Sequence, residues 1–103
     1  MSRTEKIWNF IGSVKEAYPE VSLYVGIDKD KKIYAYFDNI EAVTNKKYMI
    51  DLTGRGDTMD DAIINLAQIM MDKKYMLRYK VNLYATSKLR SIIKKSNLLG
   101  GDD

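Results

Sequence analysis

The sequence predicts a single α+β domain in which helices cover one face of an antiparallel sheet. Three observations support this prediction. Apolar residues recur at helical spacing over residues 7–18, alternate with polar residues over residues 21–27 and 33–37, and return to helical spacing over residues 59–71. A chain of 103 residues has the length of one domain. We expect residues 1–99 to form this domain and residues 100–103 a short flexible tail.

The N-terminal segment is typical of a capped amphipathic helix. Ser2 is a suitable N-cap with Glu5 three residues later, and Pro19 ends the helix because a residue before proline avoids the α conformation. Trp8 lies at the edge of the apolar stripe. We expect a half-buried side chain there, and the alternative is a partner-binding anchor. The stripe itself contains Ile7, Phe10, Ile11, Val14, Ala17 and Tyr18.

Two alternating segments joined by a polar turn predict a β-hairpin. Its inward residues are expected to be Val21, Leu23, Val25 and Ile27 on the first strand, and Ile33, Ala35 and Phe37 on the second. We expect residues 38–46 to form a looser connection, in which Ile40, Ala42 and Val43 could extend the second strand through a bulge. Residues 48–53 then alternate as a third strand of the same sheet.

A glycine turn and a strongly apolar helix follow. Gly54 and Gly56 predict a sharp turn over residues 54–57, and Thr58 predicts the N-cap of the next helix. That helix has only a narrow polar stripe, so we expect it to be covered on more than one side. A second copy of the chain could supply one cover, which makes a homodimer possible.

The C-terminal third is harder to interpret. Residues 75–84 alternate as in a fourth strand, although a continued helix fits nearly as well. Ser87 is expected to cap a last helix that ends at Gly100 and Gly101. The predicted order is therefore helix, three strands, helix, and then a basic extended or helical segment.

Composition argues against an enzyme. The chain has no His and no Cys, which removes the commonest general base, the thiol nucleophile and most transition-metal sites. Asp51, Asp57, Asp60 and Asp61 could in principle hold Mg²⁺, but helix capping explains three of the four. We expect no catalytic residue, no metal and no cofactor. The sequence also has no membrane-spanning stretch, so a cytoplasmic location is expected.

Charge is distributed unevenly along the chain. Residues 1–72 hold nine Lys/Arg and twelve Asp/Glu, whereas residues 73–101 hold eight Lys/Arg and no acid. If most of these cations share a face, they would attract phosphate, and the alternative is a solvated surface. The set consists of Lys73, Lys74, Arg78, Lys80, Lys88, Arg90, Lys94 and Lys95.

Three tyrosines are predicted on the outward face of the hairpin. Tyr24, Tyr34 and Tyr36 could stack with the bases of single-stranded nucleic acid. In the interpretation that we prefer, the apolar side of the C-terminal segment folds over these rings instead.

The predicted order resembles that of the double-stranded-RNA-binding domain. Where that family places lysines at the start of its second helix, this chain has Asp57, Asp60 and Asp61, so the resemblance concerns topology and does not imply phosphate binding there. The residues from Gly56 to Leu66 look like the strand-to-helix turn of many small antitoxin and phage proteins.

Two functions follow from these observations. The first is a non-catalytic binding protein that occupies the surface of a host protein or nucleoprotein, as small phage inhibitors do, including inhibitors of CRISPR effectors. Abundant Lys, Ile, Asn and Tyr, which have AT-rich codons, indicate a phage or low-GC bacterial origin and thus a host cytoplasm. The alternative is DNA or RNA binding through the three tyrosines and the basic C-terminal segment.

Overall fold

Helices and antiparallel strands make up the fold, so the predicted α+β class is confirmed. The computed structural model of the chain describes residues 1–44, 49–50, 52–80 and 83–100. The helices in this part are α1 (Arg3–Ala17), α2 (Met59–Met70) and α3 (Thr86–Ser96). The strands are β1 (Leu23–Ile27), β2 (Ile33–Phe37), β3 (Ile40–Thr44), β4 (Met49–Ile50), β5 (Gly54–Gly56), β6 (Tyr75–Tyr79) and β7 (Leu83–Tyr84).

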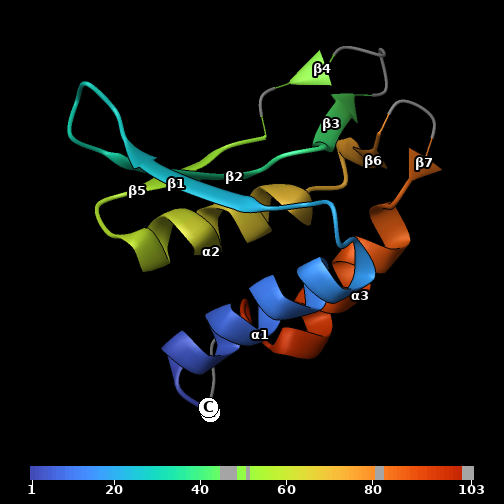
Figure 1. Ribbon diagram of the computed structural model, residues 1–103, viewed down its shortest axis with the longest axis horizontal. Helices are drawn as coiled ribbons and strands as arrows, with labels where there is room; N and C mark the ends of the chain where they lie inside the picture. Colours follow the sequence, from blue (N-terminus) through green and yellow to red (C-terminus); the bar gives the residue numbers. More distant parts are fainter. Residues whose placement is uncertain (45–48, 51, 81–82, 101–103) are drawn as a thin grey trace.

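The strands form two antiparallel sheets, whereas the sequence predicted one. The first sheet has the order β1-β2-β5, and the second has the order β4-β3-β6-β7. In Figure 1, α2 lies beneath the first sheet, and α1 and α3 lie together on the far side of α2. The prediction that residues 40–43 extend the second strand is wrong. Asn39 adopts a left-handed conformation with φ 61°, and β3 leaves to pair with β6.

The glycine segment after residue 53 is a strand and not the predicted turn. Gly54 pairs with Ala35 and Gly56 with Ile33, so β5 is the third strand of the first sheet. Part of the predicted strand at residues 48–53 lies outside the described residues. A Cβ atom added at Gly54 would lie 2.8 Å from the Cα atom of Leu66, so the glycine allows α2 to approach the sheet closely.

The first helix has the predicted ends. The Ser2 side chain accepts a hydrogen bond from the amide of Glu5, and α1 ends at Ala17, two residues before Pro19. Ile7, Phe10 and Val14 are buried. Trp8 is not half-buried as expected, because its side chain is 62% exposed.

The inward face of the hairpin is covered only in part. Ala35 and Phe37 on β2 are buried as predicted, and so is Val21 just before β1. Val25 and Ile27 lie on the same face as Ala35, as predicted, but they are 42% and 70% exposed, so the expected burial at these two positions is wrong. The physical reason is that α2 packs beneath β2 and β5 and leaves the end of β1 without a cover.

The second helix is buried by its own chain. Thr58 caps it as predicted, accepting a hydrogen bond from the amide of Asp61. Ala62, Leu66, Ala67 and Met70 have no exposed surface. The apolar arc of α2 therefore does not need a second copy to cover it, and the expected reason for a homodimer does not hold.

The C-terminal third resolves the choice between strand and helix. Residues 75–79 form β6, which pairs with β3 along its whole length. The predicted ends of the last helix are wrong: α3 begins at Thr86 with Ala85 as its N-cap residue, and it ends at Ser96 with Asn97 in a left-handed conformation. Thr86 does not cap the helix because its hydroxyl bonds the amide and carbonyl of Leu77.

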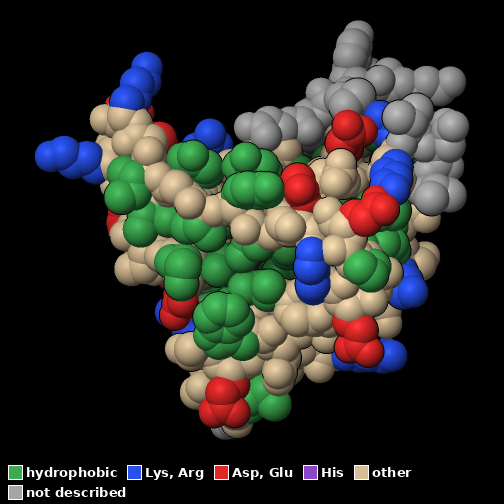
Figure 2. Space-filling view, in the orientation of Figure 1, with side chains coloured by type: hydrophobic (Ala, Val, Ile, Leu, Met, Phe, Trp, Pro, Cys, Tyr) green, Lys and Arg blue, Asp and Glu red, His purple; other side chains and the backbone are tan. Residues whose placement is uncertain are grey.

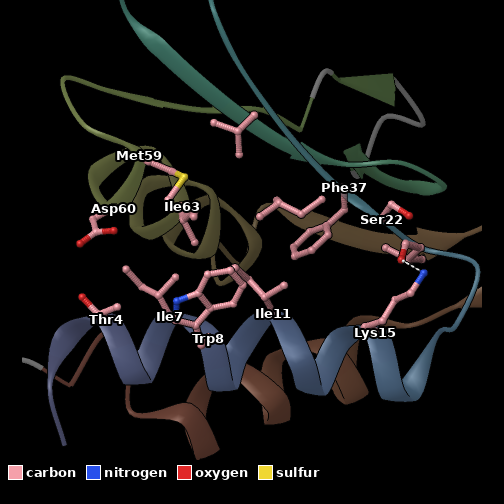
Figure 3. A pocket seen from close by; sticks show the side chains of 13 residues that line it. Thr4, Ile7, Trp8, Ile11, Lys15, Ser22, Phe37, Met59, Asp60 and Ile63 are labelled. Carbon is pink, nitrogen blue, oxygen red and sulfur yellow. Dashed lines mark hydrogen bonds between the residues drawn. The ribbon is translucent and has the colours of Figure 1, made fainter.

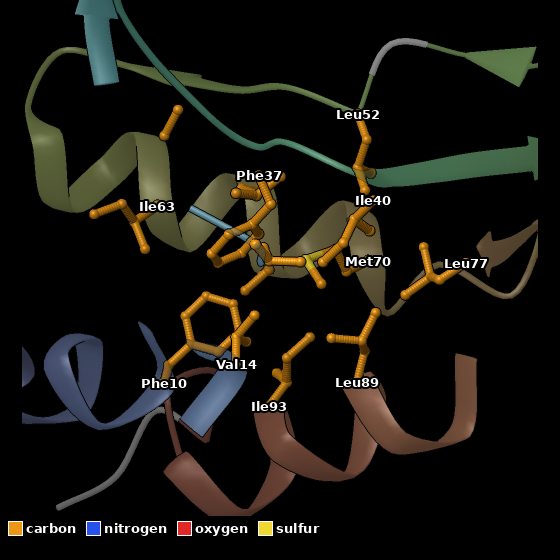
Figure 4. Close-up of a cluster of buried hydrophobic side chains, with 14 of the residues drawn as sticks. Phe10, Val14, Phe37, Ile40, Leu52, Ile63, Met70, Leu77, Leu89 and Ile93 are labelled. Carbon is orange, nitrogen blue, oxygen red and sulfur yellow. The ribbon is translucent and has the colours of Figure 1, made fainter. Parts of the chain in front are cut away.

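One core joins the three helices to both sheets. Figure 4 shows Phe10 and Val14 of α1 facing Leu89 and Ile93 of α3, with Met70 of α2 above them. Phe10 and Phe37 meet edge to face at 5.7 Å between ring centroids, which ties α1 to β2.

Candidate functional site

Three tyrosines lie side by side on the face of the first sheet that points away from α2. The ring centroids of Tyr24 and Tyr36 are 5.4 Å apart with an interplanar angle of 19°, and those of Tyr34 and Tyr36 are 6.2 Å apart with an angle of 16°. We call Tyr24, Tyr34 and Tyr36 the tyrosine face. The sequence predicts their common side correctly, because side chains alternate along a strand.

Strand register holds these rings in place. Tyr24 is paired with Tyr36, and Tyr34 is paired with Gly26. A Cβ atom at position 26 would lie 2.9 Å from Cε2 of Tyr34, so the ring leans across the glycine and needs the space that it leaves. Tyr24 is exposed, and Tyr34 and Tyr36 are half-buried.

The surroundings of the tyrosine face carry both signs of charge. Arg55 is paired with Tyr34 across β5 and β2, and its Nε atom lies 3.8 Å from a carboxylate oxygen of Asp28. A shallow hollow of about 230 Å³ is lined by Asp28, Tyr34, Tyr36, Thr53 and Arg55. Lys32 nearby forms an ion pair with Asp57, which raises the pKa of the lysine through a hydrogen bond. With Lys29 and Lys31, which are exposed in the same turn, the charges around this face nearly balance and leave only a small positive excess.

The C-terminal segment does not cover the tyrosine face, and the interpretation that we preferred from the sequence is wrong. The apolar side of α3 packs against α1, β6 and α2, with Leu89 and Ile93 fully buried. In Figure 1, α1 and α3 lie on the far side of α2 from the first sheet, whereas the tyrosines lie on the sheet face that points away from α2. In the part of the chain that the structure describes, α3 therefore leaves this face uncovered, with Tyr24 exposed and Tyr34 and Tyr36 half-buried.

Half of the predicted basic set is used within the fold. Arg78 forms an ion pair with Glu41 at 2.6 Å, Lys80 forms one with Glu20, and Lys74 lies 3.8 Å from Asp72. The hydrogen bond from Lys80 lowers the pKa of Glu20 and raises that of Lys80 itself.

Arg90 has a structural role that the sequence does not reveal. Its guanidinium donates hydrogen bonds to the carbonyl oxygens of Met70, Asp72 and Tyr75, at 3.0, 2.7 and 2.7 Å. It therefore binds the end of α2 and the start of β6 to α3, and it is not part of a surface for phosphate.

The remaining four lysines of the set are exposed. Lys73 lies in the turn after α2, and Lys88, Lys94 and Lys95 lie on α3. Lys88 places its Nζ atom 5.7 Å from the centroid of the Tyr18 ring. Because α3 and the tyrosine face lie on opposite sides of α2, the structure does not bring tyrosines and α3 lysines together as one surface (Figure 1).

A second candidate surface is an apolar groove between α1, β1 and α2, which we call the α1–β1 groove. It has a volume of about 380 Å³, and Figure 3 shows Trp8 projecting into it from α1. Nine of its thirteen lining residues are apolar: Ile7, Trp8, Ile11, Val21, Leu23, Val25, Phe37, Met59 and Ile63. In Figure 2, hydrophobic side chains gather over the region where β1 and α1 lie.

Polar residues mark the two ends of the α1–β1 groove. Asp60 and Thr4 lie at one end, and Lys15 and Ser22 lie at the other (Figure 3). The Nζ atom of Lys15 donates a hydrogen bond to the carbonyl of Val21 at 3.0 Å. The sequence named Trp8 as a possible anchor but not the groove, because the groove depends on how α1 packs against the rest of the chain.

The aspartates at the start of α2 have partners in the fold. Asp61 pairs with Arg3 at 2.6 Å, and the pKa of Asp61 is lowered first by that hydrogen bond and then by the one from Thr58. Asp57 pairs with Lys32. Within residues 1–44, 49–50, 52–80 and 83–100, no three acidic side chains gather as a metal site would require. None of the described helices is long and apolar enough to cross a membrane.

Comparison of the chain with protein-family models, with curated proteins and with solved structures found no match.

Proposed function

We propose that this chain is a non-catalytic binding protein that acts by occupying the surface of a partner protein, and that the tyrosine face is its recognition surface. The observation that supports this proposal is the row of three near-parallel tyrosine rings on a sheet face that the described chain leaves uncovered. We further propose, from composition alone, that the chain is of phage or low-GC bacterial origin and that its partner belongs to the host.

The tyrosine side chain is well suited to a protein interface. Each ring presents a large amphipathic area and has only two side-chain torsions to immobilise, so little entropy is lost on binding. Here the register with Gly26 and the stacking on Tyr36 already restrain the rings. Tyr and Arg are, with Trp, the residues enriched at the centres of protein interfaces, and Arg55 lies beside Tyr34.

The alternative function is binding of single-stranded nucleic acid. Stacked aromatic rings favour it, because bases stack on tyrosine in many such proteins. The charges argue against it: the lysines on α3 lie on the other side of α2, and Arg55 and Lys32 each have an acidic neighbour. Lys29 and Lys31 in the neighbouring turn leave only a small positive excess, so a phosphate backbone would be attracted weakly to the tyrosine face.

Retention of a host protein on the immobilised chain tests the proposal. Tyr24→Ala and Tyr36→Ala should each weaken retention by about 30-fold or more, since a central aromatic contributes about 2 kcal/mol. Tyr84→Ala is the matched control, because Tyr84 is an exposed tyrosine on the second sheet. Retention should survive nuclease treatment.

Other outcomes separate the two functions. Retention that nuclease abolishes, together with salt-sensitive binding of labelled single-stranded RNA or DNA, would establish the alternative. If Tyr24→Ala and Tyr36→Ala bind the partner as the wild type does, the tyrosine face is not the recognition surface.

A further inference from the structure

Strand β1 lies at the edge of the first sheet, and its outer main-chain groups are open. The amide of Asp38 donates to the carbonyl of Ser22, and the amide of Asp28 donates to the carbonyl of Lys32. Hydrogen-bonded pairs alternate along an antiparallel ladder, so the even-numbered residues of β1 bond to β2. The amides and carbonyls of Leu23, Val25 and Ile27 therefore point outward, and the described hydrogen bonds include none to them.

This edge lacks the features that usually prevent a strand from pairing with another chain. Exposed edge strands are usually protected from pairing by charged side chains, by proline or by a bulge. Residues 23–27 contain no charge and no proline, and they pair with β2 in unbroken register. The open edge is thus a template for a further strand.

The side chains next to this edge form an exposed apolar patch. Val25 and Ile27 lie on β1, Trp8 lies on α1, and Met59 lies at the start of α2. Three of these four residues also line the α1–β1 groove, which opens between the outer edge of β1 and α1 (Figures 2 and 3). Main-chain hydrogen-bonding groups and apolar surface therefore occupy the same side of the molecule.

We propose that a second copy of this chain occupies that side, with β1 pairing antiparallel to β1 of the second copy about a two-fold axis through Val25. The three-stranded sheet then becomes a six-stranded one. Leu23 lies opposite Ile27 of the second copy, and Val25 lies opposite its own equivalent. The two α1 helices meet below the strands, and the two α1–β1 grooves close on each other with both Trp8 side chains inside.

Charge complementarity favours a second copy as the occupant. The two-fold rotation brings the Lys15 end of one groove to the Asp60 end of the other, on both sides of the axis (Figure 3). A surface that is apolar in the middle and oppositely charged at its ends is complementary to itself in this orientation.

The available area also suits a dimer. If a side chain of this size presents roughly 150–250 Å², the exposed fractions of Trp8, Val25, Ile27 and Met59 give about 400 Å² per copy. Two copies would bury about 800 Å² from these residues, and the paired main chains of β1 add to this, which brings the area close to the lower limit of about 1,000 Å² for a specific interface. The pairing would also join two tyrosine faces into one surface of six rings. The dimer does not depend on the proposed function, since it is measured with the chain alone.

Sedimentation of the full chain from low to high micromolar concentration tests the dimer. We expect a monomer–dimer equilibrium, with the fluorescence of Trp8, the single tryptophan, shifting to shorter wavelength as the dimer forms. Val25→Lys places two ammonium groups at the axis and should raise the dissociation constant by about a hundredfold or more. Met76→Lys is the matched control, since Met76 is 40% exposed on β6, and it should leave the dimer intact.

Engineered cysteines test the register in a chain that has no natural cysteine. Directly opposed residues of a bonded pair have Cα atoms about 5.5 Å apart, within reach of a disulfide, so Val25→Cys should oxidise to a covalent dimer. The two Cα atoms at position 27 would be about 14 Å apart, beyond disulfide reach, so Ile27→Cys should not cross-link within one dimer. A monomer at all concentrations, a dimer that Val25→Lys leaves unchanged, or equal cross-linking at both positions would overturn the proposal.

Discussion

Replacing Gly54 by alanine should be among the most damaging small substitutions in this chain. An added Cβ atom would lie 2.8 Å from the Cα atom of Leu66 and closer still to the carbonyl oxygen of Ala62 and the amide nitrogen of Leu66. Carbon atoms in contact are normally about 3.5–4.0 Å apart, so α2 would have to move by roughly 1 Å. These are backbone atoms of a buried helix, and no rotamer change can relieve the clash.

The expected loss of stability follows from the cost of overpacking. Extra methyl groups in a packed core cost about 1–3 kcal/mol, and displacement of a whole helix belongs at the upper end, about 3 kcal/mol. For a domain of this size, that loss lowers the melting temperature by about 12 °C or more. Gly12→Ala is the matched control, because Gly12 is in α1 and a Cβ there meets nothing within 4 Å. It should stabilise the chain by about 0.5–1 kcal/mol.

Urea unfolding followed by circular dichroism measures both changes on the same scale. The two alanine variants should move the midpoint in opposite directions with the same slope, since the surface exposed on unfolding is unchanged. A Gly54→Ala protein with wild-type stability would show that α2 does not pack against β5 as described, and the account of the first sheet would be wrong.

Three further predictions concern the C-terminal third and its ion pairs. Leu89→Ala should lower the free energy of unfolding by about 2–5 kcal/mol in urea titrations, because Leu89 is fully buried. Arg90→Met should lower the free energy of unfolding by about 2–3 kcal/mol in the same assay, because methionine keeps the packing but leaves the three carbonyl groups without their donor. An Arg90→Met protein of unchanged stability would contradict the structural role of Arg90. Lys80 holds the pKa of Glu20 below its ordinary value of 4.5, so the ionised carboxylate stabilises the fold above pH 4.5, and this stabilisation is lost as the pH falls through the folded-state pKa. Glu20→Gln removes the carboxylate, so the stability of this variant should fall less steeply on acidification than that of the wild type. An unchanged pH profile would show that the pair with Lys80 does not form in solution.

Local features of the fold follow from the sequence because they depend on neighbouring residues. The caps at Ser2 and Thr58 need only residues three positions away. The outward direction of Tyr24, Tyr34 and Tyr36 needs only the alternation of side chains along a strand. These predictions are confirmed by the structure.

The division into two sheets could not be read in the same way. Strand β3 leaves β2 after Asn39 and pairs with β6, whose residues lie more than thirty positions later. Nothing in the alternation of residues 40–44 distinguishes a new strand from a continued one. The clue was Asp38-Asn39, two residues that favour turns, between two apolar segments.

The surroundings of the candidate site also depend on contacts between residues that are distant in the sequence. Whether the tyrosine face is covered depends on which surface receives the apolar side of α3, and α3 packs on α1 instead. The basic set was identified by charge alone, and charge does not reveal that Arg90 faces carbonyl groups or that Arg78 faces Glu41. Whether each of these side chains is free to bind a partner molecule therefore depends on residues that are distant in the sequence.

The pairing of α1 with α3 also has a consequence for synthesis. Phe10 can meet Phe37 once residues 33–37 have been synthesised, but the surface of α1 that packs against α3 stays uncovered until residues 86–96 have been made. Part of the hydrophobic side of α1 is therefore exposed while the residues between α1 and α3 are synthesised, and a pause in translation before residues 86–96 would prolong its exposure to chaperones and proteases.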